Sequence, residues 1–331
     1  MAKSSNQKLK LMYLARILMK ETDEDHGLTM PEIIDKLGAY DVKAERKSIY
    51  DDIESLQLLG MDVVKRTEGG RTEYALASRT FELVELKLLV DAVQSSRFIT
   101  KKKTQDLIKK IESMASSYQA KQLSRQVHVA NRIKNMNESI YYVVDDIHGA
   151  MLQNRQIAFQ YVKWNVEMKK EPQHEGKTYV VSPWALMWDD ENYYLVAYDG
   201  EAEGIRHYRV DKMVGLKICD EQRNGSEHFK HFDKAIYSRK TFGMFNGRDE
   251  HVTLRCENSM ADAIIDRFGH DVLLRTVGRE NFDVTVKVSI SPVFLTWLMN
   301  FGGKIRILSP QWVIDEQIKL AKAAIEQYEK E

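Results

Sequence analysis

The stretch SPWALMWDDENYYLVAYDGEAEGIRHYRVDKM, residues 182–213, decides the fold of the middle of the chain. Its hydrophobic pattern has a period of two, and clusters of Asp, Glu, Asn and Gly interrupt it. A period of two is typical of β-strands, and such clusters mark the turns between them. Similar short runs extend the pattern over residues 157–219. We therefore predict a small all-β barrel or sandwich in this region.

Three motifs in this stretch resemble the WYL-domain family of bacterial transcriptional regulators. That family reads Pro-x-x-Leu, then Trp-Tyr-Leu-x-Ala-x-Asp, then Arg-x-Phe-Arg-Leu-Asp-Arg-Ile. This chain reads PWAL at 183–186, YYLVAYD at 193–199 and RHYRVDKM at 206–213, with Tyr193 at the name-giving Trp and Tyr208 at the Phe. The resemblance covers nearly the whole chain. It implies an Sm-like β-barrel that binds a negatively charged effector, either a nucleotide or single-stranded nucleic acid.

The predicted effector site combines arginines with aromatic rings. Arginine binds phosphate through two hydrogen bonds, and aromatic faces stack on nucleobases. A histidine adds a hydrogen-bond donor whose charge depends on pH. The site that we predict comprises Tyr161, Ser182, Tyr193, Tyr194, Arg206, His207 and Arg209.

Strand geometry leaves alternatives open for this site. Arg206 points to one face of its strand, and His207 and Arg209 point to the other. Both arginines reach one pocket only if the strand bulges or lies at a barrel edge. The alternative is a structural ion pair with Asp199 or Asp211, and for any single tyrosine the alternative is a place in the core.

Residues 1–78 have the pattern of a winged helix-turn-helix. Helical spacing covers 8–21, a capping box of Thr29 and Glu32 begins a second helix, and a third helix is predicted over 43–59. Two β-prone runs then flank a Gly-Gly pair, which is typical of a hairpin. The third helix of such a module enters the major groove, and the hairpin reaches phosphates. The predicted DNA contacts are Lys43, Arg46, Lys47, Ser48 and Tyr50 on the helix, and Lys65, Arg66 and Arg71 on the hairpin.

The charge of this module argues against the DNA-binding interpretation. Residues 1–76 hold 12 basic and 14 acidic residues, and Asp51 lies on the outward face of the third helix. The family often has arginine where this chain has Asp51. The alternative is a protein-interaction module. The resemblance favours DNA, because residues 44–60 resemble the recognition helix of the family.

Residues 79–156 read as a helical linker or dimerisation segment, with three helices and a polar loop over 116–137. Residues 100–140 hold nine basic and three acidic residues. Such a run is most often a solvated helix face, and the alternative is extra phosphate contact or pairing between subunits. We expect a homodimer, as is common for helix-turn-helix proteins.

The expected fold class is α+β with several domains. Residues 157–235 form the predicted WYL domain. Residues 236–331 have a β-α-β-β-α-β-α order that suits a ferredoxin-like α/β domain, and they resemble the C-terminal extension of the family, the WCX domain. No long internal repeat is present.

The composition limits which classes of function are possible for this chain. Lys+Arg and Asp+Glu both number 49, so nucleic-acid binding must come from local patches. The two cysteines, Cys219 and Cys256, form neither a disulfide framework nor a zinc site. The sequence has no signal-peptide h-region and no membrane-spanning run, so we expect a soluble, cytoplasmic protein. We find no catalytic or cofactor motif, and the pair His228 and His231 lacks the ligands of a metal site.

The sequence therefore predicts a DNA-binding transcriptional regulator that an anionic effector modulates, and not an enzyme. Its expected partners are double-stranded DNA, a nucleotide or single-stranded effector and a second copy of the chain, with no membrane and no cofactor. The alternative is a nucleic-acid sensor that regulates a protein partner. A nucleotide-processing enzyme is a weaker alternative.

Overall fold

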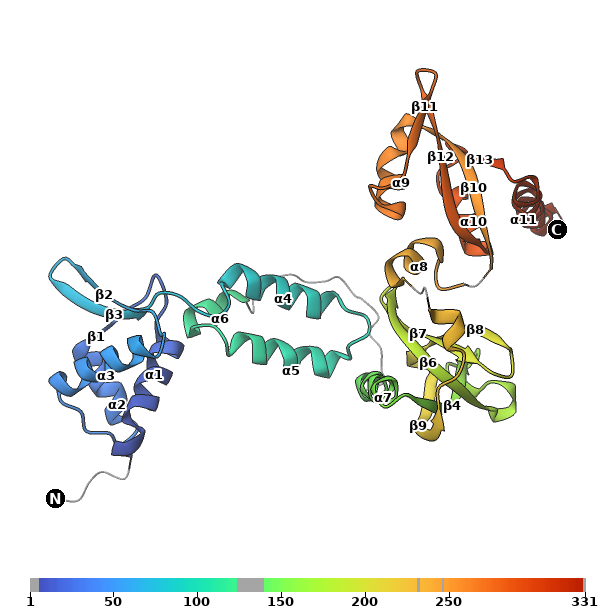
Figure 1. Ribbon diagram of the computed structural model, residues 1–331. Coiled ribbons are helices and arrows are strands. Elements are labelled where there is room, and N and C mark those ends of the chain that lie inside the picture. Colours follow the sequence, from blue (N-terminus) through green and yellow to red (C-terminus); the bar gives the residue numbers. More distant parts are fainter. Residues whose placement is uncertain (1–5, 124–139, 231–232, 246, 330–331) are drawn as a thin grey trace. The chain divides into compact units, whose positions relative to one another are not determined.

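The computed structural model describes residues 6–123, 140–230, 233–245 and 247–329 (Figure 1). The chain forms two compact units, Met1–Glu138 and Ser139–Glu331. Among the described helices, none combines the length and the apolar character that crossing a bilayer requires.

The first unit begins with three helices and a small antiparallel sheet, which we name the helix–hairpin module (residues 6–76). The sheet has the strand order β1-β3-β2. The predicted helices and hairpin are confirmed at their expected places (Figure 1). Its elements are α1 (Lys10–Glu21), β1 (Leu28–Thr29), α2 (Met30–Gly38), α3 (Arg46–Leu58), β2 (Val63–Glu68) and β3 (Arg71–Leu76).

Local chemistry explains where these elements begin and turn. The predicted capping box is present, because the Thr29 side chain accepts from the Glu32 backbone N–H and the Glu32 carboxylate accepts from the Thr29 N–H. Gly69 and Gly70 both have positive φ angles at the tip of the hairpin, which a tight two-residue turn requires. Each helix contributes fully buried apolar side chains to the shared core, among them Leu14, Ile33 and Ile49.

The rest of the first unit is a helical segment of α4 (Leu83–Ser95), α5 (Lys101–Glu112) and α6 (Ser117–Leu123). Helices α4 and α5 lie side by side (Figure 1). The prediction of a loop over 116–137 is wrong at its start, because residues 117–123 form α6. This short helix is stabilised by tertiary packing: Leu123 is fully buried in a cluster with Leu86 of α4. The remainder of that predicted loop, with Arg125, Arg132 and Lys134, lies outside the described residues.

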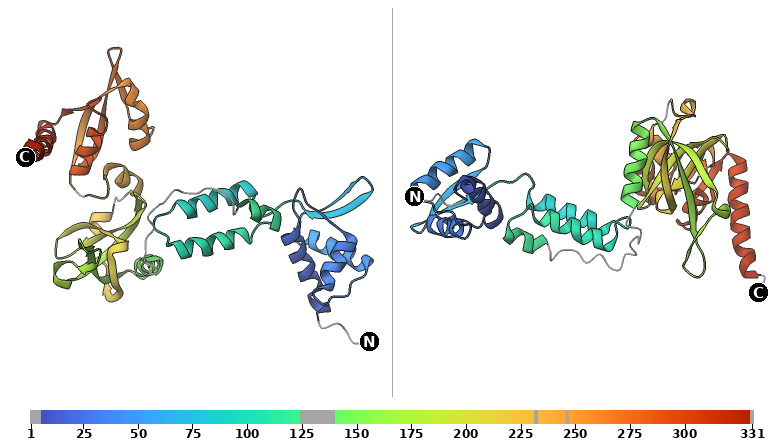
Figure 2. Two further views of the ribbon diagram at one scale, coloured as in Figure 1. Left: turned by 180° about the vertical axis from the view of Figure 1, so that it is seen from behind. Right: turned by 90° about the horizontal axis from the view of Figure 1, so that it is seen from below.

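The second unit begins with helix α7 and a six-stranded antiparallel sheet. The sheet has the order β5-β4-β6-β7-β8, and β9 pairs with β4. Figure 2 shows α7 along one side of the sheet, where Ile147 and Ala150 are fully buried. The elements are α7 (Ile140–Leu152), β4 (Arg155–Trp164), β5 (Lys170–Pro172), β6 (Thr178–Asp189), β7 (Asn192–Asp199), β8 (Gly204–Arg209) and β9 (Met213–Gln222).

The predicted barrel does not close, because β8 pairs only with β7 among the described strands. A short turn, Val210–Lys212, leads the chain away from β8, and β9 then runs beside β4. The Arg209 N–H, at the open edge of β8, donates to the Tyr161 hydroxyl at 3.0 Å instead of to a strand. β8 is therefore an edge strand, which is one of the two conditions under which both arginines can reach one pocket.

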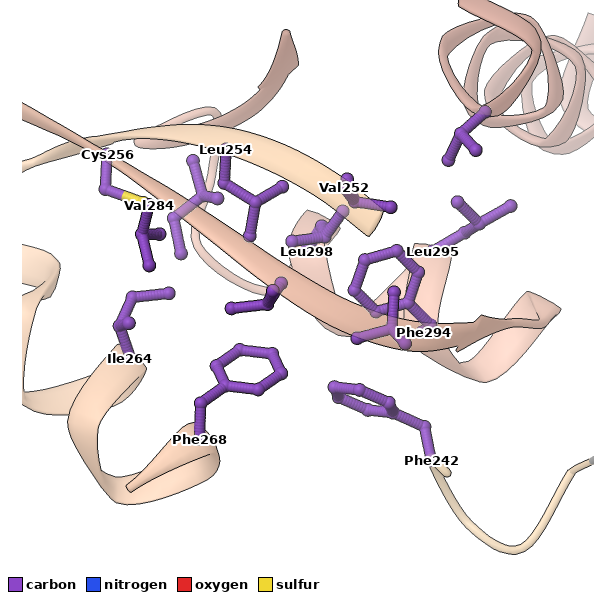
Figure 3. Close-up of a cluster of buried hydrophobic side chains, with 14 of the residues drawn as sticks. Phe242, Val252, Leu254, Cys256, Ile264, Phe268, Val284, Phe294, Leu295 and Leu298 are labelled. Carbon is purple, nitrogen blue, oxygen red and sulfur yellow. The ribbon is translucent and has the colours of Figure 1, made fainter. Parts of the chain in front are cut away.

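The C-terminal part has the predicted order of elements around a four-stranded antiparallel sheet, β11-β12-β10-β13. Its core contains Phe294, Val252 and Leu254, all fully buried (Figure 3). Cys256 also lies in this core as an apolar side chain, and neither cysteine forms a disulfide. The elements are β10 (Arg248–Glu257), α9 (Ala261–Phe268), β11 (Leu274–Val277), β12 (Asn281–Ile290), α10 (Pro292–Met299), β13 (Ile305–Ser309) and α11 (Gln311–Glu329).

Between the two sheets the chain forms α8 (Lys234–Lys240) and then a short connector, residues 241–245. Phe242 belongs to the core of the C-terminal part, whereas Met244 is buried against Ala185 and Val196 of the six-stranded sheet. The connector therefore contributes a side chain to each of two hydrophobic cores.

Candidate nucleic-acid interface and effector pocket

The first turn of α3 and the loop before it present three exposed cations: Lys43, Arg46 and Lys47. None of the three forms an ion pair with any residue that the structure describes. The opposite face of α3 is buried through Ile49 and Ile53. The helix therefore separates an apolar inner face from a cationic outer face, as its sequence predicts.

Two other predicted contacts on α3 are engaged within the module. The ammonium of Lys10 on α1 forms an ion pair with Asp52 at 2.7 Å and also binds the Ser48 hydroxyl. The Tyr50 ring is half-exposed and lies beside Tyr74, with a distance of 6.1 Å between the ring centroids. Ser48 thus helps to join α1 to α3, while Tyr50 remains partly open to a ligand.

The hairpin offers fewer free cations than its sequence suggests. The Arg66 guanidinium donates to the backbone carbonyl of Glu24. Arg71 forms an ion pair with Glu73 at 2.7 Å and a longer one with Glu32 at 3.4 Å. Only Lys65 of the three predicted hairpin contacts lacks a hydrogen-bonded or ionic partner among the described residues.

A pocket of about 480 Å³ lies at the open edge of β8 in the second unit. The structure brings five of the seven predicted effector residues to its lining, since both faces of an edge strand are accessible there. Glycine and apolar residues of the connector supply part of the wall. The lining residues are Tyr161, Tyr194, Arg206, His207, Arg209, Lys212, Gly243, Met244 and Phe245.

The two arginines of this pocket differ in their partners. Arg209 forms the structural ion pair that strand geometry leaves open, with 2.9 Å between its Nη2 and Asp211 Oδ2, and it also donates to Asn192. Arg206 is exposed and has no ionic partner among the described residues. Lys212 likewise has none. Arg206 and Lys212 are therefore the cations available to an anion.

The tyrosines divide between pocket and core. Burial raises the pKa of Tyr161 to about 12, so this hydroxyl stays neutral while it accepts from Arg209. Tyr194 is half-buried in the pocket lining. Tyr208 is a core residue: its ring packs edge-on against Phe159, and its hydroxyl donates to Asp199 at 2.8 Å. Burial, together with that carboxylate, raises the pKa of Tyr208.

His207 connects the sheet to the connector. Its Nδ1 lies 2.6 Å from the Met244 carbonyl oxygen, and its Nε2 lies 2.8 Å from the Tyr237 hydroxyl. A carbonyl only accepts, so Nδ1 carries the proton, and the neutral ring accepts from Tyr237 at Nε2. Met244, whose carbonyl accepts this bond, has a left-handed backbone conformation with φ at 56°, which non-glycine residues rarely adopt.

Burial lowers the pKa of His207 to about 4, from a usual value of 6.5. Because the folded-state pKa is depressed, the neutral ring contributes its full stability above pH 6.5 and loses it as the pH falls toward 4. Over this whole pH range the free energy of unfolding falls by about 3 kcal/mol because the buried His207 ring must become charged.

We expect His207→Gln to remove this contribution of His207 to the loss of stability between pH 7 and pH 4.5, as measured by urea unfolding. The exposed His174→Gln is the control, and an equal change in both variants would contradict the assignment.

Two predicted effector residues lie outside the pocket. Ser182 is fully buried, and its hydroxyl donates to the side chain of Asn224 and accepts from its backbone N–H. The Tyr193 ring packs edge-on against Trp188. Sequence reasoning missed Lys212 and the connector residues 243–245 as lining residues. Lys212 stands at a basic position of the family motif, a usable signal, whereas no local pattern marks Phe245.

The described residues contain no cluster of three histidine, cysteine or carboxylate side chains that is suited to a metal ion. The Nε2 atom of His228 lies 3.5 Å from Oε1 of Glu227, and His231 lies outside the described residues.

Comparison with known proteins identifies two domains in the second unit. A WYL domain model matches residues 142–218, and a WCX domain model matches residues 248–325. No curated protein matches the chain. The chain is similar to the structure of proteasome accessory factor B/C (PafBC) of Arthrobacter aurescens, with 18% identity and a TM-score of 0.29. That match covers 98% of this chain but only 49% of the PafBC chain, so this chain spans about half its length. A second similar structure, of a CRISPR Cas-related protein, has 14% identity and a TM-score of 0.36 and covers 75% of this chain and 71% of that one.

Proposed function

Because this chain belongs to the WYL-domain family of transcriptional regulators, with a WYL domain followed by a WCX domain, we propose that it is a DNA-binding regulator that an anionic effector controls. The helix–hairpin module acts as a winged helix-turn-helix. The protein acts in the cytoplasm, and two copies of the chain bind a DNA site with two-fold symmetry.

The observation that carries the DNA-binding proposal is the cationic surface formed by the first turn of α3 and the loop before it. Its three exposed cations, Lys43, Arg46 and Lys47, are neutralised by none of the described residues. Unpaired cations release counterions from DNA when they bind phosphate, whereas cations that are already paired must first give up a carboxylate. The buried face of α3 keeps the helix fixed while its first turn enters the major groove.

The pocket at the edge of β8 supports an anionic effector that contains a ring. Arg206 and Lys212 provide uncompensated positive charge. Tyr194 and the exposed ring of Phe245, which is 57% accessible, provide faces for stacking. A nucleotide or a short single strand has both chemistries, phosphate and base.

Selection of bound duplexes from a random pool tests the first half of the proposal. Duplex binding that is specific in sequence and weakens steeply with salt supports it. Recovery of no duplex, with and without oligonucleotide effectors, would overturn it. The selected sites should also be two-fold symmetric if two copies dock together.

One feature favours an alternative, a nucleic-acid sensor whose module binds a protein. Leu58 and Leu59, at the end of α3, are 85% and 75% exposed. Exposed leucines suit a protein contact. Affinity for single strands alone, without any duplex binding, would favour this second function.

Replacing Arg206 and Lys212 together by alanine is expected to weaken binding of a short single-stranded oligonucleotide by at least about 100-fold, because hydrogen bonds to charged groups contribute about 1.5–3 kcal/mol each. Fluorescence anisotropy with a labelled oligonucleotide measures the change. Lys217→Ala removes a single exposed lysine on β9, outside the pocket, and is the control. Equal losses in both variants would refute the pocket assignment.

The proposal includes no catalytic step. Nucleotides incubated with the protein are expected to be recovered unchanged, as measured by chromatography. Turnover that a pocket variant abolishes would replace the regulator proposal with an enzymatic one.

A further inference from the structure

Helix α1 has a second apolar face that the core of the helix–hairpin module does not cover. Leu14, Ile17 and Leu18 are buried in that core. Met12 and Met19, seven residues apart and therefore on one side of the helix, are 70% and 50% exposed. The helix buries one apolar face and leaves another open to solvent.

This open face is one wall of a groove of about 720 Å³ within the first unit. The end of α5 and the start of α6 form the other wall, with Ala115 and Ala120 among its apolar residues. The volume lies within the range of small-molecule sites, roughly 300–1,000 Å³. It is too small for a folded partner.

The two walls are held together by contacts at and beside the groove. Asp23, which follows α1, accepts a hydrogen bond from the Ser116 hydroxyl, and both residues are buried. The His26 ring stacks on Tyr118 of α6 at 3.7 Å between centroids. The groove is therefore a built feature of this unit.

The rim of the groove is cationic. Arg16, Lys20 and Lys109 line it against a single acidic side chain, Glu112. None of these three cations is paired with a carboxylate of the described residues. Arg79 also lines the groove; its Nη2 is fixed by the carbonyls of Met19 and Thr22 at 2.6 Å each, and its buried Nε has no hydrogen-bond partner.

We propose that this groove binds a small amphiphilic organic anion, with an apolar chain on the Met12–Met19 face and an acidic head among the rim cations. The charge and the apolar floor together select this class over neutral or cationic molecules. The site lies in the first unit and is independent of the effector pocket. Its walls come from the helix–hairpin module and the helical segment, so an occupant would fasten one to the other.

Calorimetric titration of the full-length protein with decanoate tests the proposal, with decylamine, the cation of equal chain length, as the ligand control. We expect saturable binding of decanoate, and binding at least about tenfold weaker for decylamine. No decanoate binding up to millimolar concentration, or equal binding of the two ligands, would overturn the proposal.

Two pairs of variants locate the ligand. Lys109→Ala is expected to weaken decanoate binding several-fold, whereas Lys110→Ala, which removes the neighbouring lysine outside the groove, leaves it unchanged. Met19→Gln is expected to weaken binding, whereas Met114→Gln, at another exposed methionine, does not. Circular dichroism confirms that each variant is folded. If the members of a pair behave alike, the ligand lies elsewhere and the proposal is wrong.

Discussion

Replacing Arg46 and Lys47 together by alanine is expected to weaken binding of a selected duplex by about 100-fold near physiological salt, since each lost contact to phosphate or a base edge contributes about 1–3 kcal/mol. The slope of log affinity against log salt should also become shallower, by about 0.9 for each phosphate contact removed. Electrophoretic mobility or anisotropy measurements at several salt concentrations give both quantities.

The control for this prediction is a second pair of exposed cations in the same unit. Lys101 and Lys102 lie at the start of α5. Their replacement changes the net charge of the protein equally but leaves α3 intact. If both double variants lose affinity and salt dependence to the same extent, the binding is a general charge effect and the assignment of α3 as the recognition helix is wrong.

The three hairpin cations differ in how available they are to bind phosphate, a difference that the sequence alone does not reveal. Arg71 is already paired with Glu73 and Glu32, and Arg66 is bonded to a backbone carbonyl. Lys65 has no such partner to give up. Among the three, Lys65 is the hairpin residue best placed to add a phosphate contact.

Elements with strong local signals could be predicted from the sequence. The capping box of Thr29 and Glu32, the glycine pair of the hairpin and the alternating strands are each set by residues close together in the chain. The order of elements after residue 248 follows for the same reason. Helix α6 could not be predicted in this way, because its polar sequence has no period and its formation depends on burial of Leu123 against α4.

In the candidate sites, too, features set by residues close together in the chain could be predicted, whereas features set by tertiary contacts could not. The motif RHYRVDKM identified Arg206 and Arg209, and their strand indeed lines a pocket. Arg66 binds the backbone carbonyl of Glu24, 42 positions away, and no local pattern reveals that contact. Of the two carboxylates paired with Arg71, Glu32 is 39 positions away, whereas Glu73 is only two residues away. Phe245 reaches the pocket only because the connector folds back onto the sheet, where His207 holds it at Met244.

The connector, residues 241–245, is expected to couple stability to effector binding, because Phe242 anchors the pocket wall in the core of the C-terminal part. Phe242 is 3% exposed and lies in the same cluster as Phe294 (Figure 3). The centroid of its ring lies 5.1 Å from that of Phe294 and 5.3 Å from that of Trp297. The Arg267 guanidinium lies 3.9 Å from the centre of the same ring. Loss of this ring removes buried apolar contacts and a cation–π contact together.

We expect Phe242→Ala to lower the free energy of unfolding by about 3–5 kcal/mol, as for other buried phenylalanines. Oligonucleotide binding at the pocket should weaken as well, because residues 243–245 would lose their anchor. Phe245→Ala removes the same ring three residues on, from an exposed position, and is expected to change stability by less than about 0.5 kcal/mol while still weakening binding. Urea unfolding and anisotropy separate the two effects. If Phe242→Ala lowers stability but leaves oligonucleotide affinity unchanged, the connector is not a structural part of the pocket.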